Sequence, residues 1–561
     1  MIKTIQAALK PMGKRYIQLN MAGMILLALL SAGVNVYYAD MLGQLAGALE
    51  GGANPWSAVY RIIGALSGVC LVCVAETAYK AKVKCDVTET YQKRFSGALL
   101  RAQTGDLRKM NPGDIYVRGT TNLSGAADIW PGDLWKLVFA GCKIVFSVFA
   151  ILFVKPIFCF LMIVVTAAAF FLQINVVKPM QSCKRRIFHA VGQAEALSAD
   201  MIDNIETVQI EKAQKWAFAR YQNALSGVER QYRKELLPIG LMMAGSFLCS
   251  MLPMLFGIFY PVLSYLAGGI TLADCVTVIT LALSVSTVFS AMPQILSSLE
   301  QNAASLQRVE EVWKLRDERE AYKTCVNYSF QDKDMGGDVL CKAQTLSFGY
   351  TGEEKVIRDC SFELRKNSLN LLTGMNGAGK STLSKLLNGL YLPESGAVEY
   401  FTGTAEGLEE LRSHVVIAEQ APVLFEGSLF DNIKQGNSAL TDELLRQWYA
   451  SSEIREAFSG LAGGGEAPIE QNGSNLSGGQ KKCISVCRAL LSGADMIILD
   501  EPTANLSRDI SRLIVGEIKR TIKAGQGKTL LVITHDEEFE KAFPDANKIS
   551  IADKRAECEG V

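Results

Sequence analysis

A glycine-rich segment at residues 374–382, with the sequence GMNGAGKST, has the residue types and spacing that bind phosphate groups. It follows a short β-type run at residues 370–373 and fits the pattern G-x-x-x-x-G-K-[ST] between a strand and a helix. Glycines let backbone N–H groups close around phosphate oxygens, and the start of the next helix adds its positive end. The residues predicted to form this phosphate site are Gly374, Asn376, Gly377, Gly379, Lys380, Ser381 and Thr382.

Two carboxylates downstream supply a second part of the same chemistry. Residues 496–499 form an apolar run that ends in Asp500 and Glu501, which is typical of a buried strand leading to a site. Asp500 is expected to hold Mg²⁺ with the Ser381 hydroxyl, while Lys380 reaches the β- and γ-phosphates of a nucleotide. Glu501 is expected to orient and polarise the attacking water as a general base.

The pentapeptide LSGGQ at residues 476–480 is the most specific motif in the chain. It begins a helical stretch that continues to residue 491, so its glycines and Ser477 suit an anion at a helix N-terminus. With this motif the chain resembles the ATP-binding cassette (ABC) transporters, and the pentapeptide resembles their signature motif. The resemblance implies that Ser477, Gly478, Gly479 and Gln480 contact ATP held by the opposite subunit, so that two such chains act as a pair.

Three further residues resemble family positions, and they occur in the family's order. Tyr350, in the segment SFGY, resembles the aromatic residue that stacks on adenine. Gln420, in AEQAP, resembles the Q-loop glutamine that senses Mg²⁺ and faces the membrane domain, and His535, in ITHD, resembles the switch histidine that contacts the γ-phosphate. The resemblance therefore implies ATP and Mg²⁺ as cofactors, with Glu501 and His535 as catalytic residues and Ser381, Gln420 and Asp500 around the metal.

Two segments depart from the family pattern. The D-loop, which normally ends in aspartate, reads ANLS at residues 504–507, and this change could alter communication between two ATP sites. Before the signature, Gln471 stands where exporters usually carry a coupling glutamate, with Glu470 beside it as a possible substitute.

The first half of the chain has a different character from the second. The chain as a whole is 49% hydrophobic with no net charge, but the long apolar runs lie before about residue 300. Six runs of roughly twenty apolar residues predict membrane-spanning helices, because that length crosses the hydrocarbon core. They lie at residues 17–38, 58–76, 134–154, 157–177, 236–266 and 272–291.

The distribution of basic residues predicts the orientation in the membrane. Residues 39–57 contain no lysine or arginine, whereas residues 80–118 and 178–234 are rich in them. The positive-inside rule therefore places these two basic stretches, and both ends of the chain, in the cytosol. Lys143 lies in the middle of the third run, where a lysine either lines a substrate path or extends to the interface.

Six spans followed by one C-terminal cassette resemble the type IV exporter fold of ABC transporters. The predicted fold class is an α-helical membrane domain plus an α/β P-loop ATPase domain. The predicted domains are a transmembrane domain at residues 1–313, a linker at 314–337 and an ABC nucleotide-binding domain at 338–561. The resemblance also implies coupling helices at residues 111–122 and 202–208 that dock on the ATPase domains.

The function implied by this resemblance is ATP-driven transport by a dimer of this chain with an identical or sister chain, and the expected location is a bacterial cytoplasmic membrane. Export of an amphipathic small molecule, lipid or peptide is favoured by its frequency in the family and by few charges among the expected cavity residues. The alternatives are import of a metal–siderophore complex and a role as one subunit of a heterodimer.

The six spans argue against a soluble ATPase acting on DNA or ribosomes. The intact Glu501 and the intact signature motif argue against a purely regulatory ATP site. Membrane lipid and the transported substrate are the other expected partners, and the zero net charge gives no reason to expect nucleic acid.

Overall fold

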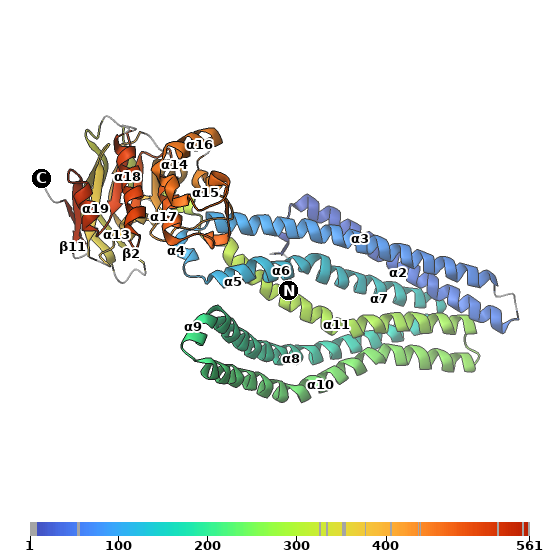
Figure 1. The fold of residues 1–561 in the computed structure, drawn as a ribbon. Coiled ribbons are helices and arrows are strands. Elements are labelled where there is room, and N and C mark those ends of the chain that lie inside the picture. Colours follow the sequence, from blue (N-terminus) through green and yellow to red (C-terminus); the bar gives the residue numbers. More distant parts are fainter. Residues whose placement is uncertain are drawn as a thin grey trace. The chain divides into compact units, whose positions relative to one another are not determined.

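In a computed structural model the chain forms two compact units (Figure 1). The described residues are 8–52, 56–324, 327–332, 335–350, 355–375, 377–403, 407–435, 437, 439–523, 527–552 and 555–558. The helical unit consists of Met1–Gly97 and Pro112–Lys314. The α/β unit consists of Ala98–Asn111 and Leu315–Val561.

The helical unit is built from long helices that contain the predicted apolar runs. Among the described residues, six helical segments are long and apolar enough to cross a membrane, which confirms the six predicted spans. Their helices are α2 (Lys14–Glu50), α3 (Trp56–Arg101), α7 (Trp135–Val154), α8 (Pro156–Asp203), α10 (Gln214–Leu266) and α11 (Leu272–Trp313). Most extend well past the apolar runs: α10 alone has 53 residues, about 80 Å at 1.5 Å per residue.

Local sequence signals explain where several of these helices begin. Pro156 opens α8, where its missing N–H costs no hydrogen bond. Thr271 and Asp274 form a capping box at the start of α11, each side chain bonding the other's backbone N–H. Figure 1 shows α8 and α10 running together, and an ion pair between Arg186 and Glu235 joins them at 2.6 Å and 3.0 Å.

The third spanning segment starts well before its apolar part, in a helical run that contains two π-helical turns. The run consists of α5 (Pro112–Val117), η1 (Arg118–Asn122), α6 (Leu123–Asp128) and η2 (Ile129–Leu134). Asp133 in η2 is fully buried and accepts hydrogen bonds from Ser298 (2.7 Å) and Asn302 (2.8 Å) of α11. These bonds satisfy a buried carboxylate, which would otherwise be costly, and they fasten the run to α11.

The turn between α3 and α5 lies earlier in the chain than the expected coupling helix at residues 111–122. Pro112 begins a helix instead of breaking one, because proline is well suited to the first helical turn. The short helix of the turn is α4 (Thr104–Leu107), and it belongs to the α/β unit. The short helix α9 (Ile205–Ile210) overlaps the second expected position.

Within the α/β unit, α4 is tied to the segment that follows α11. Asp106 forms a two-pronged ion pair with Arg316 at 2.9 Å and 3.1 Å, and the Gln103 backbone N–H donates to the Arg316 carbonyl at 2.9 Å. Ala102 and Asp317 form an isolated antiparallel bridge beside these contacts. The α4 turn is therefore held by both backbone and charged side chains.

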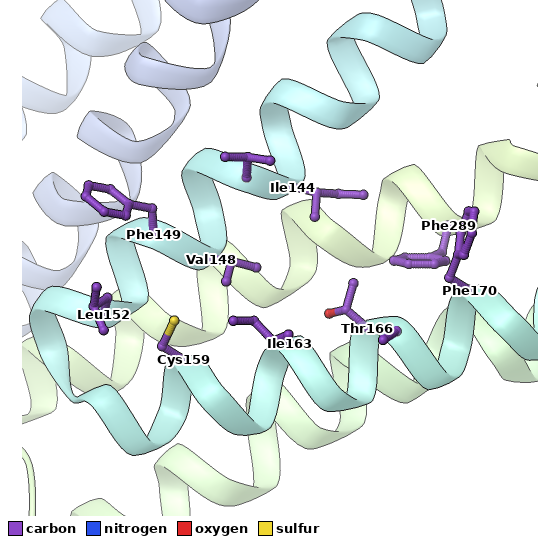
Figure 2. A pocket seen from close by; sticks show the side chains of 11 residues that line it. Ile144, Val148, Phe149, Leu152, Cys159, Ile163, Thr166, Phe170 and Phe289 are labelled. Carbon is purple, nitrogen blue, oxygen red and sulfur yellow. The ribbon is translucent and has the colours of Figure 1, made fainter.

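Two cavities of the helical unit differ in character. The first, of about 620 Å³, is an apolar groove between α7, α8 and α11. Figure 2 shows Ile144 and Val148 on one side of it, Ile163 and Thr166 on the other, and Phe289 at one end. The second, of about 560 Å³, lies between α8, α10 and α11 and includes five serines and two glutamines among its eleven lining residues. The sequence predicted that the cavity residues would be apolar with few charges. The second cavity is more polar than this prediction, because each helix contributes one polar face to its lining.

The α/β unit contains a six-stranded sheet of order β12-β11-β4-β10-β9-β6, a four-stranded sheet of order β1-β5-β2-β3, and the pair β7-β8. In the six-stranded sheet only β12 is antiparallel to its neighbour. The strands are β1 (Tyr328–Phe330), β2 (Val339–Gly349), β3 (Lys355–Arg365), β4 (Leu369–Gly374), β5 (Ser395–Tyr400), β6 (Val415–Ala418), β7 (Gly427–Ser428), β8 (Pro468–Ile469), β9 (Met496–Asp500), β10 (Thr529–Ile533), β11 (Asn547–Ala552) and β12 (Arg555–Cys558).

Helices cover these sheets and complete two apolar cores. The α-helices are α12 (Glu318–Thr324), α13 (Lys380–Leu387), α14 (Leu408–His414), α15 (Leu429–Lys434), α16 (Asp442–Ser451), α17 (Gly478–Leu490), α18 (Arg508–Lys523) and α19 (Glu537–Ala542). The 3₁₀ turns are η3 (Glu453–Phe458), η4 (Gly464–Glu466) and η5 (Gln471–Gly473). One core contains Leu372 of β4 and Ile498 of β9. The other core contains Leu371 and Leu499, the adjacent residues on the same two strands, so successive residues of a strand enter different cores.

Candidate ATP-binding site

Four loops that carry predicted site residues leave the same edge of the six-stranded sheet. Strands β4, β10, β9 and β6 run parallel, and the register places Leu372 beside Ile533 and Ile533 beside Asp500. Ligands of open parallel sheets bind at the carboxyl ends of the strands, where successive loops meet. The parallel register therefore gathers residues that lie far apart in the sequence.

The phosphate-binding loop between β4 and α13 depends on glycine at several positions. Gly377 and Gly379 have φ angles of +83° and +99°, which side chains rarely adopt. A Cβ on Gly379 would also lie 2.6 Å from Cδ1 of Ile357. Lys380 begins α13 and its ammonium donates to the backbone carbonyls of Gly374 (2.7 Å) and Met375 (3.1 Å). Asn376, which the sequence also placed in this loop, lies outside the described residues.

A cavity of about 560 Å³ opens at this loop and brings most of the predicted residues together. Its lining residues are Val356, Gly377, Gly379, Lys380, Ser381, Thr382, Gln420, Glu501, Ala504, Asn505 and His535. The sequence prediction did not include Val356, which comes from β3 and had no motif around it. Asn505 belongs to the D-loop that departs from the family pattern, and here it lines the cavity.

Glu501 is held between two side chains of the cavity. Its carboxylate accepts a hydrogen bond from Nε2 of Gln420 at 2.5 Å, and its other oxygen lies 3.2 Å from Nδ1 of His535. The Glu501 backbone has a φ angle of +47°, an uncommon conformation, and its N–H donates to the Ile533 carbonyl at 2.9 Å. This backbone bond and the two side-chain contacts fix the direction of the carboxylate.

Asp500 lies beside this group at the end of β9 and is almost fully buried. Burial raises the pKa of its carboxyl above the ordinary value, and a hydrogen bond with Ser381 acts in the opposite direction. The carboxylate of Asp500, the hydroxyl of Ser381 and the amide oxygen of Gln420 are hard oxygen donors, which suit Mg²⁺. The donor set therefore fits the metal expected from the sequence.

Lys482 is a positioning residue that the sequence analysis missed. It lies in α17 and is only 4% exposed, and its ammonium donates to three carbonyls: Glu419 (3.1 Å), Gln420 (3.0 Å) and Asp500 (2.9 Å). Burial lowers the pKa of this ammonium to about 8, against the opposing effect of Asp500 and Glu501. In the sequence it is one of two adjacent lysines, and nothing local distinguishes it from the partly exposed Lys481.

Replacing Lys482 with methionine should lower both stability and ATP hydrolysis. The three carbonyls would lose a shared donor, and an unsatisfied buried polar group costs about 1–3 kcal/mol. Thermal unfolding and steady-state hydrolysis of the purified protein measure the two effects. Lys481→Met is the matched control, because Lys481 makes a single bond to the Asn472 carbonyl. Equal behaviour of the two variants would contradict the positioning role.

Tyr350 lies at the edge of the site within a cluster of aromatic rings. Its ring makes edge contacts with Phe348 at 5.2 Å and Tyr391 at 5.4 Å between ring centroids, and its hydroxyl lies 2.9 Å from Oγ1 of Thr382. The Tyr350 side chain is about half exposed, so one part of the ring is free to meet a ligand. The guanidinium of Arg108, from the α4 turn, lies 5.3 Å from the centre of the Tyr391 ring.

Replacing Tyr350 with alanine should weaken ATP binding by about 1–3 kcal/mol, the usual range for stacking of an aromatic ring on a base. The maximal hydrolysis rate should change less than the apparent Michaelis constant. Tyr350→Phe keeps the ring and removes only the contact with Thr382, so its nucleotide titration should stay close to wild type. An unchanged titration of Tyr350→Ala would show that this ring does not hold adenine.

The signature residues are not part of this cavity. Ser477 caps α17: its hydroxyl accepts from the Gln480 backbone N–H at 3.3 Å, and its own N–H donates to Oε1 of Gln480 at 2.9 Å. Gln480 also donates to the Ala457 carbonyl at 2.9 Å, so its side chain is used to hold the helix start. Gly478 and Gly479 begin the first turn of α17, directly after the Ser477 cap.

Comparisons with known proteins agree with this architecture. The family described as ABC transporter matches residues 357–504, and the family described as ABC transporter transmembrane region matches residues 20–289. Together the two matches take in most of the chain, in the order membrane region then ATPase. The chain belongs to the ABC transporters, with a membrane region and an ATP-binding domain fused in one polypeptide.

Individual relatives are distant. The mitochondrial iron-sulfur clusters transporter ATM1 of Candida glabrata is 24% identical over 65% of this chain and 49% of its own length. An ATP-dependent lipid A-core flippase of Pseudomonas fluorescens is 24% identical over 82% of this chain and 75% of its own length. The chain spans about half the length, or less, of the first curated relatives it matches.

A solved structure of a bacterial Atm1-family ABC exporter with ATP bound has the same fold. It superposes with a TM-score of 0.80, covering 97% of this chain and 95% of that chain, at 18% sequence identity. The predicted fold class is therefore confirmed: six apolar helices of a type IV exporter fold and a C-terminal ABC ATPase domain. The match to the ABC transporter family over residues 357–504 places the ATP-binding domain in the α/β unit.

Proposed function

We propose that two copies of this chain form a transporter of the bacterial cytoplasmic membrane that exports an amphipathic small molecule, lipid or peptide at the expense of ATP. The observation that supports this most is the match of nearly the whole chain to an exporter fold, with a TM-score of 0.80. The ATPase part of the proposal is supported by the cavity that brings Lys380, Gln420 and Glu501 together.

The geometry suggests a division of labour among the cavity residues. The N–H groups of residues 377–382 and the Lys380 ammonium would bind the phosphates, and Tyr350 would take the adenine. Glu501, aimed by Gln420 and His535, would orient the attacking water and accept its proton. His535 would in addition contact the γ-phosphate, as the switch position of the family implies.

Mg²⁺ would be held by Ser381, Asp500 and Gln420, and it would offset the negative charge of the β- and γ-phosphates. Gln420 would then have two tasks, because its Nε2 donates to Glu501 and its amide oxygen would serve as a metal ligand. A shift of the Q-loop would thus change both the base and the metal environment. Lys482, which donates to the carbonyls of Glu419 and Gln420, would limit that shift.

The direction of transport can be tested in inside-out membrane vesicles, whose ATPase domains face the bath. With ATP and Mg²⁺, these vesicles should accumulate a labelled substrate from a panel of an amphipathic dye, a fluorescent lipid and a hydrophobic peptide. Vesicles carrying Glu501→Gln are the matched control and should not accumulate any of the three. ATP-dependent loss of an iron–siderophore complex from preloaded vesicles would instead show the importer.

The composition of the dimer needs a separate experiment. Two copies of the chain with different affinity tags, expressed together, should purify together if the transporter is a homodimer. Recovery of each tagged copy with only an untagged sister chain would show a heterodimer, and the ATP sites would then be shared between different chains.

A further inference from the structure

Asn505 adds a neutral amide to the wall of the cavity at the phosphate-binding loop. It lies between β9 and α18 and lines this cavity together with Lys380, Glu501 and His535. The residue is exposed, so a ligand in the cavity can reach its side chain. A carboxamide carries two N–H donors and an acceptor oxygen but no charge. Asn505 can therefore donate hydrogen bonds to an anion without forming an ion pair with a neighbouring carboxylate.

The backbone keeps Asn505 close to the proposed base. Its φ angle is +60°, a left-handed conformation that asparagine adopts more readily than most side chains. The same loop begins with Glu501 at φ +47°, and the N–H of Ala504 donates to the Glu501 carbonyl at 3.4 Å. The loop therefore turns back on itself directly after Glu501, and both residues remain on the cavity wall.

A side-chain contact joins this loop to the loop that carries His535. The Thr503 side chain is 6% exposed, and its hydroxyl donates to the Asp536 carboxylate at 3.0 Å. Asp536 is itself fixed, because its backbone N–H donates to the Thr534 hydroxyl at 3.0 Å. Since Asp536 follows His535 directly, these bonds limit the movement of Asn505 relative to His535.

The far end of the loop is held by the start of α18. The Ser507 hydroxyl accepts from the Ile510 N–H at 3.5 Å, and the Ser507 carbonyl accepts from the Ser511 N–H at 3.0 Å. Ser507, which stands where the family usually has aspartate, is therefore a helix cap. Of residues 504–507 the cavity lining includes the first two, and of these only Asn505 has a polar side chain.

A terminal phosphate in this cavity would lie close to a carboxylate of the same charge. Glu501 is held on the cavity wall by Gln420, so it cannot turn away freely. The ammonium of Lys380 donates to two backbone carbonyls of its own loop, so part of its hydrogen-bonding capacity is already used. An N–H donor from Asn505 would stabilise a phosphate oxygen and leave the charge of Glu501 unchanged.

We propose that the side-chain amide of Asn505 donates a hydrogen bond to the γ-phosphate of the ATP bound by its own chain. The bond would stabilise the negative charge that the phosphate oxygens carry while water attacks. Asn505 would also distinguish ATP from ADP, because only ATP has a γ-phosphate. This inference rests on the ATP site of the proposed function and adds a contact to it.

Nucleotide binding without turnover tests the proposal. The purified full-length dimer carrying Glu501→Gln is titrated by calorimetry with ATP and with ADP, each with Mg²⁺. Adding Asn505→Gly should weaken ATP binding about tenfold, because a hydrogen bond to a charged group is lost, and should change ADP binding less than about twofold. Glycine is the suitable deletion because it adopts a positive φ angle without strain.

A change of charge at the same position gives a second measurement. Asn505→Asp keeps the shape of the side chain but replaces its N–H donors with a negative charge, so it should weaken ATP binding more than glycine does. Ser507→Asp is the matched control, because it adds the same charge to the same loop outside the cavity lining. A negative charge is favourable at the start of a helix, so this variant should bind both nucleotides like the Glu501→Gln parent.

Mixed dimers show which chain's nucleotide the amide meets. All chains carry Glu501→Gln, and one chain of each dimer has its own site disabled by Lys380→Ala. Asn505→Gly in the chain with the intact site should weaken ATP binding about tenfold, whereas the same change in the disabled chain should leave it unchanged. The reverse result would place the amide at the partner's nucleotide and overturn the assignment.

Three other results would also reject the contact with the γ-phosphate. They are an unchanged ratio of ATP to ADP affinity in both Asn505 variants, an equal loss for the two nucleotides, and an effect of Ser507→Asp as large as that of Asn505→Asp. Each of these results would leave the proposed ATP site in place. A parent dimer that binds neither nucleotide would reject the ATP site itself, and this inference with it.

Discussion

Replacing Glu501 with glutamine should reduce ATP hydrolysis by about 100- to 10,000-fold, the usual contribution of a general base. Glutamine has nearly the same shape and can still accept the hydrogen bond from Gln420, but it cannot take a proton from water. The residues that bind phosphate are not touched, so the affinity for ATP should remain close to wild type. Phosphate release at saturating ATP and equilibrium binding of a fluorescent ATP analogue measure the two quantities.

Glu419→Gln provides the matched control for this substitution. Glu419 is adjacent to Gln420 but forms a half-exposed ion pair with Lys385, and such pairs contribute little, so hydrolysis should stay within about twofold. Near-normal turnover of Glu501→Gln in a dimer whose two chains both carry the change would reject the role of Glu501 as the base.

Replacing Gly478 with aspartate should also abolish most hydrolysis, although Gly478 does not line the cavity of its own chain. A negative charge in the first turn of α17 would repel a phosphate at this helix start, and loss of one such stabilising contact typically costs about 100- to 1,000-fold in rate. A Cβ at Gly478 would meet nothing within 4 Å, so the fold should tolerate the change. Gly493→Asp, at another open glycine, should hydrolyse ATP normally.

Mixed dimers reveal whether the signature acts on the other chain's nucleotide. A dimer of one Gly478→Asp chain and one Lys380→Ala chain keeps one intact site if each site is shared, because both defects then fall in the other site. If each chain served its own nucleotide, both sites would be defective. The mixed dimer should therefore regain hydrolysis that both parent homodimers lack, and no recovery would contradict sites shared across the dimer.

The two predictions depend on different kinds of information in the chain. Glu501 was identified as a candidate base from a strand ending in two carboxylates, and the structure adds the contacts that aim it, from Gln420 and His535. Gly478 was placed by the signature alone, and the single chain shows only a well-capped helix start there. The proposal that it acts on the nucleotide of a second chain therefore rests on the family resemblance.

Local sequence determined the class of protein and its two-part organisation. A bilayer requires about twenty apolar residues per span, so six spans are visible in the sequence. A phosphate loop requires glycines at fixed spacing before a helix, so the segment from Gly374 to Thr382 is also visible. Spans and phosphate loops depend only on residues that are close in the chain, so they can be recognised in a single sequence.

Only the tertiary structure decided which residues meet across long sequence distances. The parallel register of β4, β10, β9 and β6 gathers the site, and Lys482 becomes important because three carbonyls, two after β6 and one at the end of β9, converge on it. The sequence placed the first coupling turn at residues 111–122, whereas the short helix α4 of this turn lies at Thr104–Leu107. The two positions were hard to distinguish because a proline can either break a helix or start one, and Pro112 starts α5. The polarity of the second cavity was hidden because hydropathy averages over all faces of a helix, whereas a cavity is lined by one face from each of several helices.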